Sequence, residues 1–76
     1  MKITFDQSDK AQAFVTSVVL TKSIDRLAAE IDVWKAKRSG DTAVRALKIN
    51  SLRNERTELY NLREQIDLAR RLAGFL

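Results

Sequence analysis

The chain has 76 residues, of which 45% are hydrophobic and 32% charged, and its formal net charge is +4. This balance is typical of globular and coiled-coil proteins, and the length allows one domain, residues 1–76. Because cysteine and histidine are both absent, a disulfide framework and the usual zinc sites are excluded. A chain this short has a small core, so regular helix packing or self-association must supply its stability.

No apolar run is longer than three residues, as in Val18-Val19-Leu20. A membrane-spanning helix needs about 20 apolar residues, and the first residues lack the apolar stretch of a secretory signal. We therefore expect a cytoplasmic protein with no membrane segment. There is no proline and there are two glycines, so the composition favours long helices.

Residues Met1 to Phe5 alternate between apolar and polar types, which predicts a short strand or an extended arm, and we expect an extended arm over residues 1–7. Asp6 and Ser8 are good N-cap residues, and we predict a helix from about residue 8 to about residue 38. Valine and threonine cluster between Phe14 and Thr21. Because β-branched side chains lose rotamer freedom in a helix, a bend or a strand in this stretch stays an alternative.

A heptad spacing of 4, 3, 4 and 3 then predicts the seam, the stripe of this helix that faces its neighbour: Leu20, Ile24, Leu27, Ile31 and Trp34. The segment 39–42 follows and is predicted to be a turn. Gly40 can adopt the left-handed conformation that closes a helix, and Asp41 or Thr42 can cap the next one. A turn this short makes the two helices antiparallel.

The second helix is predicted from about residue 43 to about residue 73, with Gly74 as its C-terminal stop. Its expected seam is Leu52, Leu59, Leu62, Ile66, Ala69, Ala73 and Leu76. Asp67 is expected to form exposed i,i+4 ion pairs with Arg63 and Arg71. The predicted fold is all-α, a long antiparallel helical hairpin in which Trp34 lies near Leu47 and Phe5 reaches Leu72, Phe75 and Leu76.

Both helices carry apolar residues outside their seams. A two-helix hairpin buries one stripe per helix, and exposed apolar patches usually mark an interface. We therefore predict a homodimeric four-helix bundle, with the N-terminal arm folding back over the patch as the alternative. The candidate residues for the dimer contact or for a protein partner are Phe14, Val15, Val18, Val19, Tyr60, Leu68, Leu72 and Phe75.

The excess positive charge lies in the middle of the chain. Seven basic and two acidic residues fall between Lys35 and Arg56, whereas the rest of the chain has seven basic and eight acidic residues. Cations near the turn can contact phosphates without reading sequence, although such residues also serve as a solvated face. The candidate nucleic-acid patch is Lys35, Lys37, Arg38, Arg45, Lys48 and Arg53.

No catalytic pattern is present. Nucleophilic catalysis of the Ser–His or Cys–His type needs a histidine, and the sequence has no glycine-rich phosphate-binding loop. We expect no enzymatic activity, no metal and no cofactor.

We expect a protein that binds a macromolecule, namely a protein that it regulates or inhibits. Small phage modulators of host proteins are similar in size, an analogy of size alone. The alternatives are a nucleic-acid-associated protein that uses the basic turn end and a structural coiled-coil assembly factor.

Overall fold

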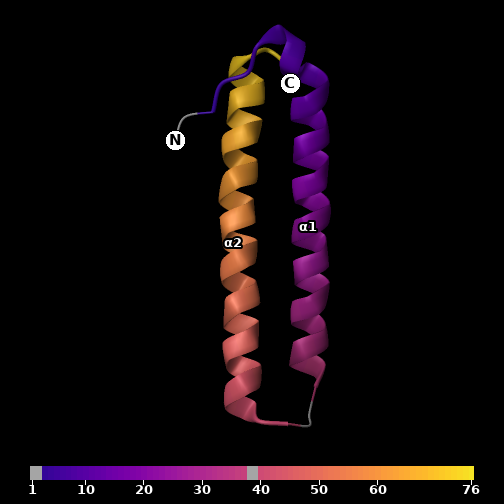
Figure 1. Cartoon of the computed structure of the whole chain (residues 1–76), viewed down its shortest axis with the longest axis vertical. Coiled ribbons are helices and arrows are strands. Elements are labelled where there is room, and N and C mark those ends of the chain that lie inside the picture. The colour runs from indigo at the N-terminus through magenta and orange to yellow at the C-terminus, as the bar shows by residue number, and fades with distance from the viewer. Residues whose placement is uncertain (1–2, 38–39) are drawn as a thin grey trace.

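With few residues that interrupt a helix, the chain folds into two long helices joined by a short turn (Figure 1). The computed structural model describes residues 3–37 and 40–76. A short 3-10 helix, η1 (Gln7–Asp9), leads into α1 (Lys10–Ala36), and α2 (Thr42–Leu72) runs back antiparallel to it. The described residues contain no strand, which confirms the predicted all-α hairpin.

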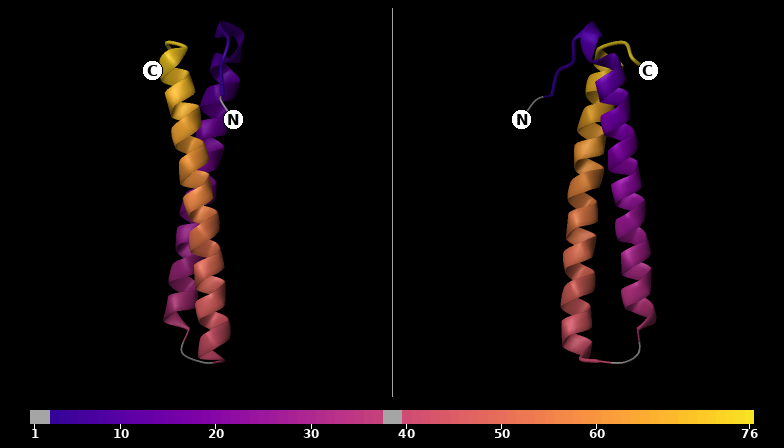
Figure 2. Two further views of the ribbon diagram at one scale, coloured as in Figure 1. Left: turned by 90° about the vertical axis from the view of Figure 1, so that its left-hand side faces the viewer. Right: turned by 45° about the vertical axis from the view of Figure 1, so that its right-hand side comes forward.

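The hairpin is a rod with principal extents of 52 × 20 × 13 Å. Two further views show the helices side by side along their length, crossing at a shallow angle (Figure 2). We call the end that holds the turn the turn end, and the end that holds both termini the open end. Neither helix is long and apolar enough to cross a membrane in the part of the chain that the structure describes.

The predicted arm is shorter than seven residues, because Gln7 already belongs to η1. The Asp6 amide donates to Asp9 Oδ2 at 2.8 Å and the Asp9 amide donates to the Asp6 carbonyl at 3.0 Å. These bonds satisfy amides that a helix start leaves without partners. The helical segment thus begins within two residues of the predicted position, residue 8. Asp6, and not Ser8, is the N-cap of η1.

Helix α1 is continuous through the β-branched stretch, so the alternative of a strand there is wrong. Thr16 Oγ1 donates to the Gln12 carbonyl at 2.8 Å, and Thr21 Oγ1 donates to the Ser17 carbonyl at 3.0 Å. Each threonine hydroxyl donates to the carbonyl four residues earlier in its own helix, a local bond that serine and threonine commonly make inside helices.

The turn is built as its residues predict. Helix α1 ends at Ala36, two residues before the predicted limit, and Gly40 has a φ of 101°. Asp41 Oδ1 accepts from the Ala43 amide at 2.8 Å, so Asp41 is the cap of α2. Arg45 Nη1 donates to the Lys37 carbonyl and ties the first turn of α2 to the end of α1. Arg38 and Ser39 lie outside the described residues.

Helix α2 ends in a Schellman motif at the predicted glycine. The Phe75 amide donates to the Arg70 carbonyl at 2.8 Å and the Gly74 amide donates to the Arg71 carbonyl at 3.1 Å. Gly74 has a φ of 79°, a conformation that costs other residues a clash with their Cβ atom. The glycine therefore fixes the point at which the chain leaves α2.

The hydrophobic core runs along the seam and is thickest toward the turn end. Leu27, Ile31 and Leu52 are buried at its centre, with three partly buried residues packed against them: Trp34, Ile49 and Leu59. Ala13, Leu20, Ile24, Ile66 and Ala69 continue the buried stripe toward the open end. The predicted seam of α1 is confirmed.

The predicted seam of α2 is wrong at Leu62 and Leu76, which are 39% and 63% exposed. Leu47 is 71% exposed and does not belong to the core against which Trp34 packs. The inward positions of α2 follow a 4, 3 spacing that passes through partly buried arginines, Arg45, Arg56, Arg63 and Arg70. Long cationic side chains can bury their stems and keep their charge near the surface, so the leucine pattern alone misplaced the seam.

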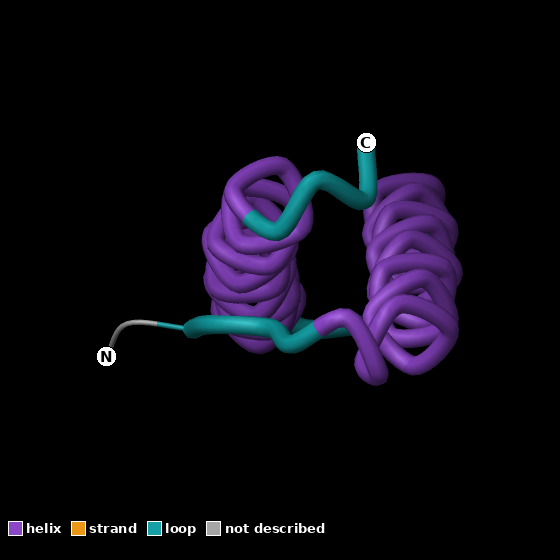
Figure 3. The backbone as a smooth tube through the Cα atoms, turned by 90° about the horizontal axis from the view of Figure 1, so that it is seen from above, coloured by secondary structure: helices purple, strands orange, loops and turns teal. Residues whose placement is uncertain are grey.

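Both chain ends cross the gap between the helices at the open end, as the view from above shows (Figure 3). The Phe5 and Phe75 rings lie 6.2 Å apart between centroids, and Gln7 Nε2 donates to the Ala73 carbonyl at 3.0 Å. The predicted contact of Phe5 with Phe75 is confirmed. Leu72 and Leu76, 73% and 63% exposed, are left uncovered by the arm.

Candidate interaction surfaces

The outer strip is an apolar surface on α1, made of Phe14, Val15, Val18 and Val19. Their side chains are 57%, 55%, 37% and 55% exposed. At about 100° per residue, the centre of this group lies roughly opposite the buried stripe of α1. Val15, Val18 and Val19 therefore face away from α2, whereas Phe14 lies at the edge of the strip, where the Arg70 guanidinium of α2 approaches its ring.

The arm does not cover the outer strip. Ile3, Thr4 and Phe5 instead line a hollow with Asp9, Gln12, Thr16 and Ile66, and none of the four strip residues lines it. The alternative in which the arm covers the patch within one chain is therefore wrong for the described arm residues, Ile3–Asp6. Over the described residues all four side chains of the strip remain exposed, and Arg70 of α2 approaches Phe14 alone among them.

The remaining candidate residues belong to α2 and the C-terminal tail, and they do not join the outer strip in one surface. Leu68 and Leu72 are 54% and 73% exposed and lie one helical turn apart on the side of α2 away from α1. Tyr60 is 40% exposed, with the Arg63 guanidinium 5.1 Å from its ring centroid. Phe75 is half-buried against Phe5.

Phe14 also borders a hollow at the open end, which we call the terminal hollow. Its volume is about 720 Å³, and it is lined by Gln7, Ser8, Lys10, Ala11, Phe14, Arg70 and Phe75. The Arg70 guanidinium lies 5.7 Å from the Phe14 ring centroid. The hollow thus combines two aromatic walls with two cations, a lining that suits an apolar group beside a negative charge.

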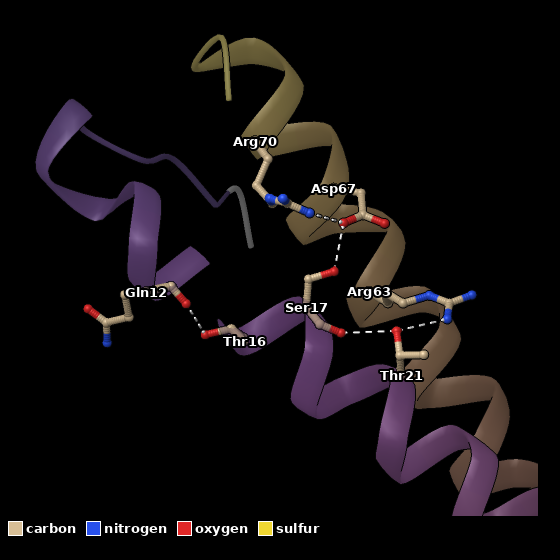
Figure 4. A network of polar contacts seen from close by, with 7 residues as sticks. All are labelled: Gln12, Thr16, Ser17, Thr21, Arg63, Asp67 and Arg70. Carbon is tan, nitrogen blue, oxygen red and sulfur yellow. Dashed lines mark hydrogen bonds and ion pairs between the residues drawn. The ribbon is translucent and has the colours of Figure 1, made fainter. Parts of the chain in front are cut away.

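A set of inter-helix polar contacts, the polar ladder, holds the open half of the hairpin (Figure 4). Ser17 Oγ donates to Asp67 Oδ1 at 3.1 Å, and Arg70 Nη1 lies 3.3 Å from the same oxygen. One turn further toward the turn end, Arg63 Nη1 donates to Thr21 Oγ1 at 3.3 Å. The ladder takes the place of apolar seam contacts where α2 presents arginines.

The polar ladder corrects the expected ion pairs. Asp67 pairs with Arg70, three residues away, and not with Arg63 or Arg71. The Arg70 side chain is 12% exposed and its Nε finds no hydrogen-bond partner among the described residues. The sequence does contain a pattern that predicts inward-facing arginines. Arg56, Arg63 and Arg70 are spaced seven residues apart, so all three lie on the stripe of α2 that faces α1.

The basic candidates gather mainly around the turn end. Lys37 Nζ lies 4.0 Å above the Trp34 ring centroid, and Arg45 is partly buried by its bond to the Lys37 carbonyl. Lys35, Lys48 and Arg53 are exposed, with Arg53 further along α2. Over residues 3–37 and 40–76 the one ion pair is Arg70–Asp67, so no carboxylate neutralises these cations. The candidate Arg38 lies outside the described residues.

The described residues contain no cluster of acidic side chains that could hold a metal ion. Comparison with known proteins found no matching family, no matching curated protein and no matching solved structure. The exposed apolar surfaces at the open end and the cations at the turn end are therefore the features on which a function can be argued.

Proposed function

We propose that this chain is a non-enzymatic binding protein that docks a protein partner, which it regulates or inhibits, through the apolar surfaces of its open end. The observation that carries this proposal is its accessible surface of 5749 Å². A compact folded chain of this mass exposes about 4,700 Å². The excess, on the order of 1,000 Å², is comparable to the roughly 800 Å² that each partner buries in a standard interface.

The open end is the favoured docking region because the large apolar side chains there lie close together. Phe14 belongs to both the outer strip and the terminal hollow, and exposed aromatic residues next to a concave surface are typical interface anchors. Lys10 and Arg70 border the same hollow. A partner segment with an aliphatic or aromatic side chain next to an acidic residue fits this lining.

The test replaces Ala11, which lines the terminal hollow, with a photo-crosslinking amino acid. The variant is expressed in the cell of origin and illuminated, so that a partner bound at the hollow becomes covalently attached. We expect one discrete heavier adduct that disappears when the chain also carries Phe14→Glu. Val33→Glu is the matched control, because Val33 is 58% exposed on the same helix and lies far from the hollow. Adducts that persist in Phe14→Glu, or no adduct at all, contradict the proposal. A product of twice the chain mass identifies a second copy.

Nucleic-acid binding at the turn end is a second candidate. It is favoured by the cations around the turn, Lys35, Lys37 and Lys48, none of which is paired with a carboxylate over the described residues. Labelled DNA and RNA titrated with the protein at two salt concentrations test it by fluorescence anisotropy. Several phosphate contacts give a steep dependence of affinity on salt, and no binding at low salt rejects this candidate.

A further inference from the structure

We infer that the occupant of the outer strip is a second copy of this chain, with the two α1 helices packed antiparallel around a two-fold axis beside Val18 and Val19. This inference rests on the proposed function, because it names the first partner of that apolar surface. The resulting pair places its helices in the order α2, α1, α1, α2. This is a flat layer of four helices with both terminal hollows left open to a further protein partner.

The shape of the molecule supports a second copy. Its radius of gyration is 16.2 Å, whereas a compact chain of this length has about 11 Å. A two-helix rod has a single seam, and α1 carries an apolar face on each of two opposite sides. Pairing the outer strips gives α1 a helix neighbour on both sides, so that both of its apolar faces are covered.

A hollow next to the outer strip has the geometry that helix–helix packing uses. It has a volume of about 210 Å³ and is lined by Val19, Lys22, Ser23 and Arg26. These residues stand at positions i, i+3, i+4 and i+7, the four-residue diamond that receives a knob side chain from a facing helix. The surface next to the strip is thus a hole for one side chain of the partner.

The antiparallel two-fold arrangement supplies that side chain. Val15 lies three to four residues before the axis and the centre of the hollow lies three to four residues after it. Val15 of each copy therefore stands at the level of the hollow in the other copy. Contacts of this kind are self-complementary, as a two-fold interface requires, and Val18 and Val19 meet their counterparts at the axis.

Charge decides between the antiparallel and parallel arrangements. In a parallel pair each residue faces its own copy, so Lys22 meets Lys22 and Arg26 meets Arg26 at the contact. In the antiparallel pair the two Lys22 residues are about seven residues apart along the axis, on the order of 10 Å. Their aliphatic stems then lie over Val15 of the other copy while their ammonium groups reach solvent.

The association is measured by sedimentation equilibrium of the full chain over a range of concentrations. We expect a mass of two copies for the wild type and for Val33→Glu, and a mass of one copy for Val18→Glu. Circular dichroism shows whether Val18→Glu keeps its helix content, and Val19→Lys serves as a second strip variant. A wild-type chain that stays monomeric at high micromolar concentration, or a Val18→Glu chain that stays dimeric, overturns the inference.

Orientation is read from disulfides, because the chain has no cysteine of its own. Under mild oxidation, Val18→Cys should link to itself, and Val15→Cys should link to Lys22→Cys when the two variants are mixed. Val15→Cys alone should not link, because its two copies lie farther apart than the roughly 7 Å that a disulfide spans between Cα atoms. Self-linking of Val15→Cys indicates a parallel pair and refutes the arrangement. A monomeric chain that still gives the Phe14-dependent adduct refutes this inference alone and leaves the proposed function standing.

Discussion

Replacing Arg70 tests whether the stem or the charge of a nearly buried arginine stabilises the open half of the hairpin. Its side chain is 12% exposed, one nitrogen lies 3.3 Å from Asp67 Oδ1 and the guanidinium lies near the Phe14 ring. Arg70→Ala removes the stem and the charge together. Arg70→Met keeps an unbranched apolar stem of similar length and removes only the charge.

The two variants should differ in their free energy of unfolding. Burial of the stem contributes about 1–2 kcal/mol. The pair with Asp67 adds at most about 1 kcal/mol, because the Asp67 side chain is 36% exposed and stays solvated. Against these, the buried Nε without a partner costs roughly 1–3 kcal/mol. Arg70→Ala should therefore be less stable than Arg70→Met by the contribution of the stem, about 1–2 kcal/mol. Arg70→Met should be at least as stable as the wild type, because the relief of the Nε offsets the lost ion pair.

Urea unfolding followed by circular dichroism gives the comparison, with Arg71→Ala as the matched control. Arg71 is the neighbouring arginine, is exposed, and its loss should change stability by less than about 0.5 kcal/mol. If Arg70→Met is as destabilising as Arg70→Ala, the charge rather than the stem stabilises α2 and the reasoning fails. If Arg71→Ala is the more costly change, the ion pair of Asp67 is with Arg71 after all.

Three further changes have definite expected outcomes. Leu52→Ala should cost about 2–5 kcal/mol of unfolding free energy, because Leu52 is 4% exposed in the core, whereas Leu62→Ala should cost under about 1 kcal/mol; equal losses in urea unfolding would restore Leu62 to the seam. Gly74→Ala should lower stability by about 1 kcal/mol through its positive φ, and an unchanged thermal midpoint would show that the Schellman motif does not constrain the tail. Charge reversal at Lys37 and Lys48 should lower stability by about 1 kcal/mol or less, because Lys37 Nζ lies over the Trp34 ring. It should abolish any salt-dependent DNA binding measured by anisotropy, and binding that survives locates the nucleic-acid site elsewhere.

The hairpin could be predicted from the sequence because its signals are local. The leucine and isoleucine spacing of α1, the Gly40–Asp41 turn and the Gly74 stop each specify their structure within a few residues. The seam of α2 could not be read in the same way, because Arg56, Arg63 and Arg70 occupy inward positions that apolar patterning treats as breaks. An arginine stem packs like an aliphatic chain, but it is buried only where the facing helix has polar groups that can bind the guanidinium, as Thr21 does for Arg63.

The candidate surfaces were predicted in part. The surplus apolar side chains of α1 follow from helical periodicity, since Phe14, Val15, Val18 and Val19 do not share the seam. Whether the arm covers them depends on the side on which residues 3–6 cross the helices, and that is a tertiary property. For the same reason the sequence grouped Leu68 and Leu72 with the strip, although they lie on the opposite side of the hairpin.

The distribution of the core links stability to the inferred pairing. The clustered large side chains, Leu27, Ile31 and Leu52, lie in the turn half. The open half buries a narrower stripe that includes two alanines, Ala13 and Ala69, with Leu20 and Ile66, and the polar ladder holds it. Polar contacts that remain partly exposed contribute little net stability, so the open half is the weaker part of the rod. The outer strip lies on this same half. A partner that binds only the folded chain stabilises it by mass action, so pairing through the strip reinforces the part of the hairpin where its own core is thinnest.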